Sequence, residues 1–182
     1  MHGFLIAAVL VAGVSAVLDW RTGLIPNWIT LPALLGGPLA HVIYGIRVQG
    51  LAANDALQEG GVSLGGAILC SFAPLILYRQ NAIGGGDIKL LAAQGAIGQV
   101  TIGIEMELYA FLAAAIIAPA RLAYDGKLLK TLKNTGLLFR NTVMPKDKRI
   151  PIDAEAMSWF RFGPAIFIGT VVSAVLRWNQ QP

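Results

Sequence analysis

Two aspartates stand beside apolar segments and are the residues of this chain best placed to do chemistry. Asp87 ends a glycine run in Gly84-Gly85-Gly86-Asp87-Ile88-Lys89. Asp19 ends an apolar segment and opens the stretch Asp19-Trp20-Arg21-Thr22-Gly23-Leu24-Ile25-Pro26-Asn27. An ionised aspartate at the centre of a bilayer costs about 2.5–3.5 kcal/mol on insertion scales. A carboxylate in such surroundings therefore calls for a functional or structural reason.

If Asp19 and Asp87 meet, they form a pair of carboxyl groups suited to hydrolysis. Two neighbouring carboxyl groups do not both ionise easily, so the pair holds one shared proton. The ionised member activates water as a base, and the protonated member donates a proton to the leaving group. The three glycines let a backbone or an extended peptide approach Asp87 closely. Each aspartate alone has a simpler interpretation, because Asp87 can cap a helix and Asp19 can pair with Arg21 or face water.

The polar neighbours of the aspartates have two interpretations each. Lys89 and Arg21 either anchor their helices at the membrane surface or favour the ionised form of a nearby aspartate. Pro26 and Asn27 are expected to fix how the chain enters its second apolar segment, which would hold Asp19 in place.

Other polar residues of the apolar segments predict no further site. Glu105 and Glu107 are two positions apart, hence on different helix faces, and we expect both to be solvated at the membrane interface. His2 and His41 lack the spacing of metal ligands, and the single Cys70 allows no disulfide within the chain. The sequence predicts neither a cofactor nor a metal.

The composition predicts an all-α polytopic membrane protein. Of the 182 residues, 55% are apolar and only 13% are charged, with a mean hydropathy of +0.64. Soluble proteins carry about 25% charged residues. Since membrane-spanning segments leave little sequence for anything else, residues 1–182 are expected to form a single membrane-embedded domain.

Six apolar segments are long enough to be considered as transmembrane helices, given that a span needs about 20 residues. They cover residues 3–18, 25–46, 61–78, 87–100, 102–123 and 162–178. We expect them to pack into one bundle, with Gly61 and Gly65 at a spacing that lets helices approach closely. A cleaved signal peptide is the alternative for the first segment, but it lacks a basic leading region.

The positive-inside rule orients these six segments. The loops after the first, third and fifth segments share one side of the membrane, and that side holds twelve of the 14 basic residues, whereas the opposite side holds Arg47 and Arg177. The twelve are Arg21, Arg79, Lys89, Arg121, Lys127, Lys130, Lys133, Arg140, Lys146, Lys148, Arg149 and Arg161. Both termini are therefore expected outside, and both aspartates at cytoplasmic helix ends.

The long loop at 125–161 is predicted to be cytoplasmic and basic. Lys127, Lys130 and Lys133 recur every three residues, opposite three leucines. This pattern is typical of a short helix at the lipid headgroups, where anionic lipid attracts basic residues; a docking site for a partner is the alternative. The chain carries a net charge of +4. Because its basic residues are concentrated on one side, we expect them to contact membrane lipids rather than nucleic acid.

Taken in order, the motifs resemble the type IV prepilin peptidases, membrane aspartic proteases of the GxGD class. Gly84-Gly85-Gly86-Asp87-Ile88-Lys89 is similar to their G-x-G-D-x-K motif, and Asp19 to Asn27 is similar to the segment of their first aspartate. Arg161-Phe162-Gly163-Pro164-Ala165 resembles their last motif, usually P-F-G-P, with Arg161 in place of the first proline.

The resemblance implies an activity and roles for the matched residues. Asp19 and Asp87 would be the catalytic pair. The glycines Gly84, Gly85 and Gly86 would shape the active-site loop with Lys89 beside it, and Arg21, Pro26, Asn27, Phe162, Gly163 and Pro164 would support it. The substrate would be a prepilin-like precursor, whose apolar helix packs in the bilayer and whose short basic leader is cut off at the cytoplasmic face of a bacterial inner membrane.

Larger bacterial members of this family carry an N-terminal domain with paired C-x-x-C motifs and also methylate the trimmed pilin. This chain has one cysteine and resembles the short members associated with Flp or tight-adherence pili, so the resemblance does not extend to methyl transfer. A small ion- or proton-coupled transporter is the main alternative function, followed by a non-catalytic assembly subunit. The sequence does not indicate the oligomeric state.

Overall fold

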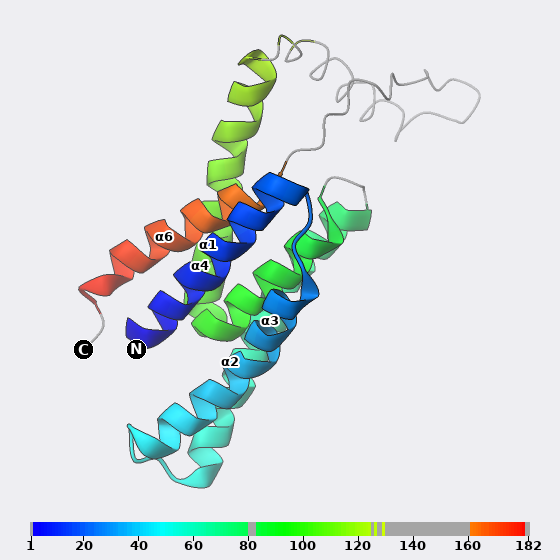
Figure 1. Cartoon of the computed structure of the whole chain (residues 1–182). Coiled ribbons are helices and arrows are strands. Elements are labelled where there is room, and N and C mark those ends of the chain that lie inside the picture. The colour runs from blue at the N-terminus through cyan, green and yellow to red at the C-terminus, as the bar shows by residue number, and fades with distance from the viewer. Residues whose placement is uncertain (1, 80–82, 125, 127–128, 130–160, 181–182) are drawn as a thin grey trace, which may run out of the picture. The chain divides into compact units, whose positions relative to one another are not determined.

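The computed structural model describes residues 2–79, 83–124, 126, 129 and 161–180, and within these the secondary structure is helical (Figure 1). The helices are α1 (His2–Thr22), α2 (Asn27–Arg47), α3 (Ala53–Arg79), α4 (Gly85–Tyr124) and α6 (Gly163–Trp178). Of the described helices, the first four are long and apolar enough to cross a membrane, and α6 is a shorter apolar helix. The prediction of an all-α polytopic membrane protein is confirmed.

The described helices cover all six predicted segments because α4 contains two of them. Its helical geometry breaks at Gln99, where φ is 57° and ψ is −169°, and a second helical arm follows. The first arm, residues 85–98, corresponds to the predicted segment 87–100, and the second arm to 102–123. The number of membrane crossings and the outside location of the termini remain predictions.

The chain divides into two compact units. The first comprises residues 1–114 and 161–182, and all the packing considered below lies within it. The second comprises residues 115–160. Nearly all of the predicted basic loop at 125–161, including the three lysines of its expected surface helix, lies outside the described residues.

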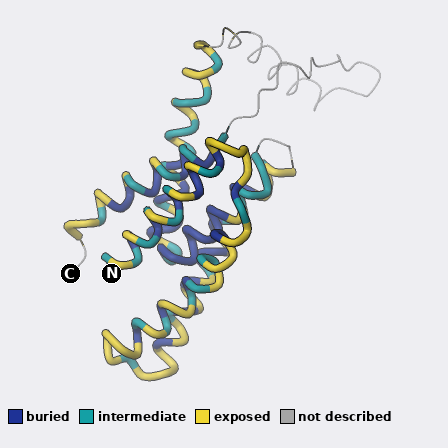
Figure 2. Tube along the Cα trace, in the orientation of Figure 1, coloured by how far each residue is buried: buried dark blue, intermediate teal, exposed yellow. Residues whose placement is uncertain are grey.

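The first arm of α4 is the central element of the first unit. Every residue from 90 to 98 is buried, as the dark blue segment of Figure 2 shows. At 1.5 Å per residue the arm is about 21 Å long, shorter than the hydrocarbon core of about 30 Å. A helix of this length ends inside the apolar bundle, where water does not reach its last carbonyl groups.

Side chains from neighbouring helices bind these carbonyls. His41 of α2 donates through Nε2 to the carbonyl of Ile97 at 2.9 Å, and the Ser63 hydroxyl of α3 donates to the carbonyl of Ala96. Unsatisfied backbone groups cost several kcal/mol in hydrocarbon, so these bonds make the break at Gln99 tolerable. The side chain of Gln99 itself donates to the Glu59 carboxylate at 2.7 Å.

Glycines allow the arm to pack closely against α3, although not those that the sequence predicted. A Cβ on Gly66 would collide with the backbone of α4 at Gly95, and the reverse is also true. By contrast, a Cβ on Gly61 would meet nothing within 4 Å, and one on Gly65 would make an ordinary contact. The prediction for Gly61 was therefore wrong: the spacing was recognised, but the closely packed face of α3 contains Gly66.

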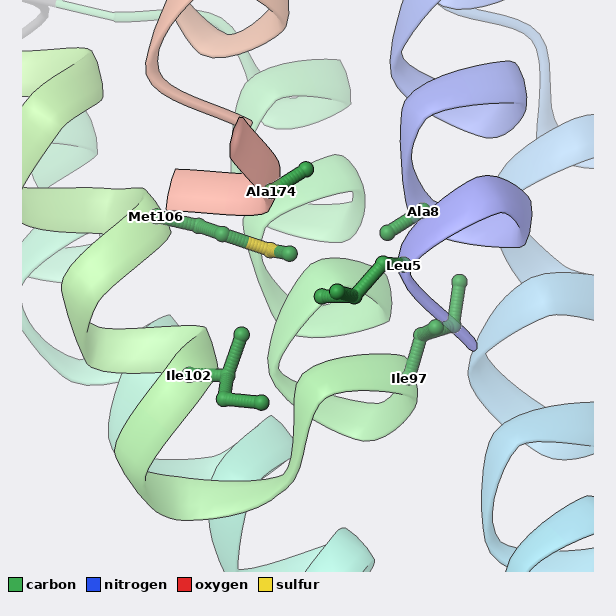
Figure 3. Close-up of a cluster of buried hydrophobic side chains, with 6 residues drawn as sticks. All are labelled: Leu5, Ala8, Ile97, Ile102, Met106 and Ala174. Carbon is green, nitrogen blue, oxygen red and sulfur yellow. The ribbon is translucent and has the colours of Figure 1, made fainter. Parts of the chain in front are cut away.

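Helices α1 and α6 lie side by side and antiparallel (Figure 1). At one end the His2 imidazole bonds to the carbonyl of Trp178 at 3.0 Å, and at the other the Gly163 N–H bonds to Asp19 at 3.0 Å. Between these ends, apolar side chains of α1, α4 and α6 pack together as drawn in Figure 3. The register of α1 on α6 is thus fixed at both ends, which positions Asp19.

We predict that His41→Ala destabilises the fold by about 1–3 kcal/mol, because it leaves the buried carbonyl of Ile97 without a partner. Unfolding in mixed detergent micelles, followed by tryptophan fluorescence, measures the effect. Ser71→Ala is the control, since it removes an exposed hydrogen bond to a carbonyl of its own helix and should change the free energy of unfolding by no more than about 0.5 kcal/mol. Equal losses in the two variants would contradict this account of the α4 break.

Candidate active site

Asp19 lies in the last turn of α1 with 6% of its surface exposed. Its Oδ2 accepts a hydrogen bond from the backbone N–H of Gly163, the first residue of α6. A Cβ on Gly163 would lie 2.8 Å from that same oxygen. The glycine is therefore needed for this close approach, and the third sequence motif is in direct contact with the first aspartate.

Asp87 lies in the first turn of α4 with 7% of its surface exposed. Its Oδ2 accepts a hydrogen bond at 2.9 Å from the N–H of Gly84, the residue just before the helix. A carboxylate at the third helical position that binds the N-cap N–H is one half of a capping box. The helix-capping interpretation of Asp87 thus has a basis in the structure, and it leaves the second carboxylate oxygen available for chemistry.

The stretch after Asp19 packs on the stretch around Asp87. A Cβ on Gly86 would lie 3.0 Å from the Cβ of Ile25, which is buried. Three residues after Gly86, Lys89 donates through Nζ to Oδ1 of Asn27 at 2.8 Å. The glycine run therefore admits the extended chain between α1 and α2, and Asn27 joins the two motifs directly.

These contacts bring the segments that carry Asp19 and Asp87 together. They come from helices far apart in the sequence and lie at one end of the first unit. Chemically, two buried carboxyl groups within electrostatic reach can act together as an acid and a base.

The remaining predicted residues lie around this pair. Pro26 is half-buried and precedes α2, while Arg21 is exposed. Phe162 is buried, and its ring packs on that of Phe111 with 5.4 Å between centroids. Pro164 lies in the first turn of α6. Gly85 is near the ring of Tyr78, where an added Cβ would make an ordinary contact at 3.7 Å.

Arg161 is a residue whose importance the sequence did not indicate. It occupies the position where the motif usually has proline, two residues before the glycine whose N–H binds Asp19. The main partner of Asp19 is the N–H of Gly163 rather than a side chain on α1. The departure from the motif was visible in the sequence, but its consequence depends on how α6 packs against α1.

The burial of Glu107 shows that another prediction was wrong. The sequence suggested a carboxylate solvated at the interface, but Glu107 is 7% exposed and its Oε1 has no partner among the described residues. The buried thiol of Cys70 on α3 lies close to its carboxyl group. Glu105 is also removed from free solution, because Arg177 binds its Oε2 at 2.7 Å. Spacing along one helix could not reveal these partners, which α3 and α6 provide.

The fold and the site define a helical, multi-pass membrane protein with two buried aspartates near each other at one end of its bundle. Residues 4–119 match the type IV leader peptidase family, and the chain belongs to that family. This confirms the resemblance seen in the sequence motifs.

Three curated relatives agree with this membership. Leader peptidase HopD of Salmonella typhimurium is 39% identical over 80 residues, 44% of this chain and 49% of that protein. The prepilin leader peptidase/N-methyltransferases of Vibrio cholerae and Escherichia coli are 32% and 35% identical, over 56% and 44% of this chain. The alignments span 37% and 34% of those two proteins. The chain thus matches half or less of the length of each relative, and no solved structure matches it.

We predict that Gly163→Ala destabilises the fold by about 1–3 kcal/mol, the usual cost of overpacking, because the new methyl group would displace Asp19. Gly61→Ala is the matched control, because Gly61 lies within a helix and an added Cβ would meet nothing within 4 Å. This substitution should stabilise the fold by about 0.4–1 kcal/mol. Thermal unfolding in detergent measures both. A neutral Gly163→Ala would show that Asp19 and the start of α6 are less tightly packed than their contact indicates.

Proposed function

We propose that the chain is a membrane aspartic endopeptidase that removes the short basic leader of prepilin-like precursors, with Asp19 and Asp87 as its catalytic pair. Membership of the type IV leader peptidase family supports peptidase activity on such precursors. The observation that carries the assignment of residues is that the stretch after Asp19 packs on the stretch around Asp87, through Gly86 against Ile25 and the Lys89–Asn27 hydrogen bond, with both carboxylates buried.

In the proposed reaction the pair starts with one shared proton. The ionised carboxylate takes a proton from water as the water oxygen attacks the carbonyl carbon of the scissile peptide bond. The protonated carboxyl group donates its proton toward the peptide, and the C–N bond breaks as the nitrogen becomes protonated. The leader leaves with a new carboxyl end and the pilin with a new amino end, so one water is consumed and the pair regains its proton.

The backbone around the pair is suited to holding it still during this reaction. Each aspartate gives one oxygen to a backbone N–H, from Gly163 or Gly84, so the other oxygen can face water and substrate. Lys89 and Asn27 act as positioning residues in this proposal, because their hydrogen bond joins the two segments that carry the aspartates. Gly86 supports the same junction, since it leaves space for Ile25.

The proposed location is the cytoplasmic face of a bacterial inner membrane. Arg21, Arg79 and Lys89 lie at the helix ends nearest the aspartates, whereas Arg47 and Arg177 end α2 and α6 at the opposite side of the predicted topology. Basic residues favour the cytoplasmic side. A basic leader would then be cut where it leaves the bilayer, while the rest of the precursor remains in the membrane.

One observation keeps the transporter alternative in consideration. Glu107 is a buried carboxyl group well inside the second arm of α4, and intramembrane acids often bind cations or relay protons. This alternative predicts a cation-dependent uptake that Glu107→Gln abolishes and Asp19→Asn leaves intact. The proposed peptidase predicts the opposite sensitivity, because leader removal should need Asp19.

We predict that Asp19→Asn and Asp87→Asn each lower the rate of leader removal by at least about a thousandfold, because neither amide can act as a base or share the proton of the pair. Reconstituted chain and a prepilin precursor are incubated in liposomes, and product is followed by gel shift and by mass spectrometry of the new amino end. Asp55→Asn is the matched control, since it makes the same change on an exposed residue in the first turn of α3.

Equal membrane insertion of all three variants must accompany the result, because a misfolded variant would also be inactive. Continued cleavage by either Asp19→Asn or Asp87→Asn would falsify the catalytic pair. If Asp55→Asn also abolished cleavage, the loss would reflect a general effect of removing a carboxylate.

A further inference from the structure

Several buried polar atoms inside the bundle have no hydrogen-bond partner among the described residues. They are Oγ of Ser15, Oγ1 of Thr30, Oε1 of Gln94, Oε1 of Glu107 and Oγ of Ser173. A buried polar atom that lacks a partner destabilises a fold, and in native proteins ordered water commonly provides one. Two of these atoms, on Ser15 and Gln94, belong to the same helix interface as Asp19.

This interface lies between α1 and the first arm of α4. Gln94 is fully buried, and its Nε2 donates to the carbonyl of Ala8 at 3.0 Å. Apolar side chains of the two helices pack together around Ala8, as Figure 3 shows. Ser15 lies on the same buried face of α1, seven residues after Ala8 and four before Asp19. The face that packs on α4 therefore includes both the bond to Gln94 and the first aspartate.

The two unpartnered oxygens are directed at the same turn of α1. A helical carbonyl points toward the residue four positions later, so the amide of Gln94 lies near the turn of Ala12. The side chain of Ser15 leans back toward that turn, because the Cα–Cβ bonds of a helix tilt toward its amino end. A bridging water spans about 5.5 Å, the length of two hydrogen bonds and about one turn of helix. One water molecule can therefore reach both oxygens.

The hydroxyl of Ser15 is not used by its own helix. Thr170 of α6 is equally buried, and its hydroxyl donates to the carbonyl of Ile166, four residues earlier, at 2.8 Å. Thr22 makes the same kind of bond to the carbonyl of Leu18. Ser15 makes no such bond, so its hydroxyl can donate into the interface with α4.

Asp19 is the next polar side chain along this face of α1. Side chains four residues apart on a helix have their Cβ atoms about 5–6 Å apart, and Asp19 leans back toward the turn of Ser15. Its Oδ2 is bound by the N–H of Gly163, so Oδ1 is the oxygen that can turn toward Ser15.

We propose that Ser15 and Gln94 form a buried water-binding site one helical turn beneath Asp19. The Ser15 hydroxyl donates to the water, and the water donates to Oε1 of Gln94 and to Oδ1 of Asp19. The water then has three polar partners, the number that buried water usually has. Ser15 is thus a positioning residue, since it holds the carboxyl group of Asp19 through water. This role rests on the proposed peptidase function, whereas the binding of water does not.

Water-edited solid-state NMR tests the water site. The full-length chain, labelled with ¹³C and ¹⁵N, is placed in liposomes, and the transfer of magnetisation from water to each side chain is measured. We expect Ser15 to receive at least about threefold more than Thr170, because the Thr170 hydroxyl is equally buried but is bonded within its helix. Equal transfer to the two side chains would overturn the water site, since Ser15 would then be bonded within α1.

Gln94→Met tests whether the site is shared. Methionine fills a similar volume but removes the oxygen that accepts from the water. A buried water with fewer polar partners is bound less well, so the transfer to Ser15 should fall at least about twofold toward that of Thr170. Unchanged transfer would overturn the assignment of Gln94 to the site.

Kinetics test the effect on Asp19. Ser15→Ala is compatible with the packing, because α1 already buries alanines at Ala8, Ala12 and Ala16. Loss of a hydrogen bond that holds the carboxyl group should lower kcat for a prepilin precursor about tenfold and leave KM within about twofold. A merely structural serine would change neither constant in the folded enzyme. A kcat within about twofold of the parent value, or a rise in KM alone, would overturn the positioning role.

Ser173→Ala is the matched control for the kinetics. It removes a hydroxyl that is equally buried and equally unpartnered. Ser173 lies ten residues along α6 from Gly163, about 15 Å from the residue that binds Asp19. Both kinetic constants should therefore stay at the parent values, and a loss equal to that of Ser15→Ala would overturn the proposed link to Asp19.

The outcomes separate the water site from the function. If the parent chain cuts no precursor, the proposed peptidase function is wrong, and the NMR comparison still decides whether water is bound. If the chain cuts the precursor but Ser15 receives no more water magnetisation than Thr170, the peptidase stands and the water site is wrong.

Discussion

The structure depends on the burial of one short helix, the first arm of α4. Its peptide groups lie in an apolar interior, and its carboxyl end lies against α2 and α3. A backbone that ends there must find hydrogen-bond donors within the protein. His41 and Ser63 provide them from two other helices, so the position of this arm is fixed by α2 and α3. Asp87, at the opposite end of the same arm, takes its position from these distant bonds.

The same constraint explains the pattern of residues inside and outside the bundle. In a membrane the apolar surface of lipid replaces water, so large apolar side chains face outward and small or polar ones face the other helices. Helix α1 follows this pattern, because it buries Ala8, Ala12, Ser15 and Asp19 and exposes Leu10 and Val17. Glycines complete the packing where backbones meet, as between Gly66 and Gly95. The aspartates belong to this inward set, which places them among backbone groups rather than in open solvent.

Much of the fold could be predicted from the sequence, because hydropathy and charge act along the chain. The apolar segments, the all-α class and the candidate aspartates follow from composition, motif and resemblance. The phase of each helix could not be predicted in the same way. All faces of these helices are apolar, so no periodic contrast indicated that Gly66 rather than Gly61 meets α4, or that Glu107 is buried. The left-handed backbone at Gln99 could not be predicted either, because glycine is the residue that usually adopts this conformation. The role of Arg161 required the contact between α6 and Asp19.

In the proposed peptidase, a site at the end of the bundle would reconcile two opposed requirements of hydrolysis in a membrane. Water must reach the scissile bond, which favours the membrane surface, while the carboxyl groups must be partly removed from water to share a proton. Asp19 and Asp87 meet both conditions, because they lie in terminal helical turns and yet are almost fully buried. Backbone groups at Gly163 and Gly84 contact the two carboxyl groups directly, and Gly86 lets Ile25 pack beside Asp87. A glycine lets a backbone group approach a carboxyl group more closely than any residue with a Cβ could. The glycines of the motifs are thus explained by close packing at and beside the aspartates.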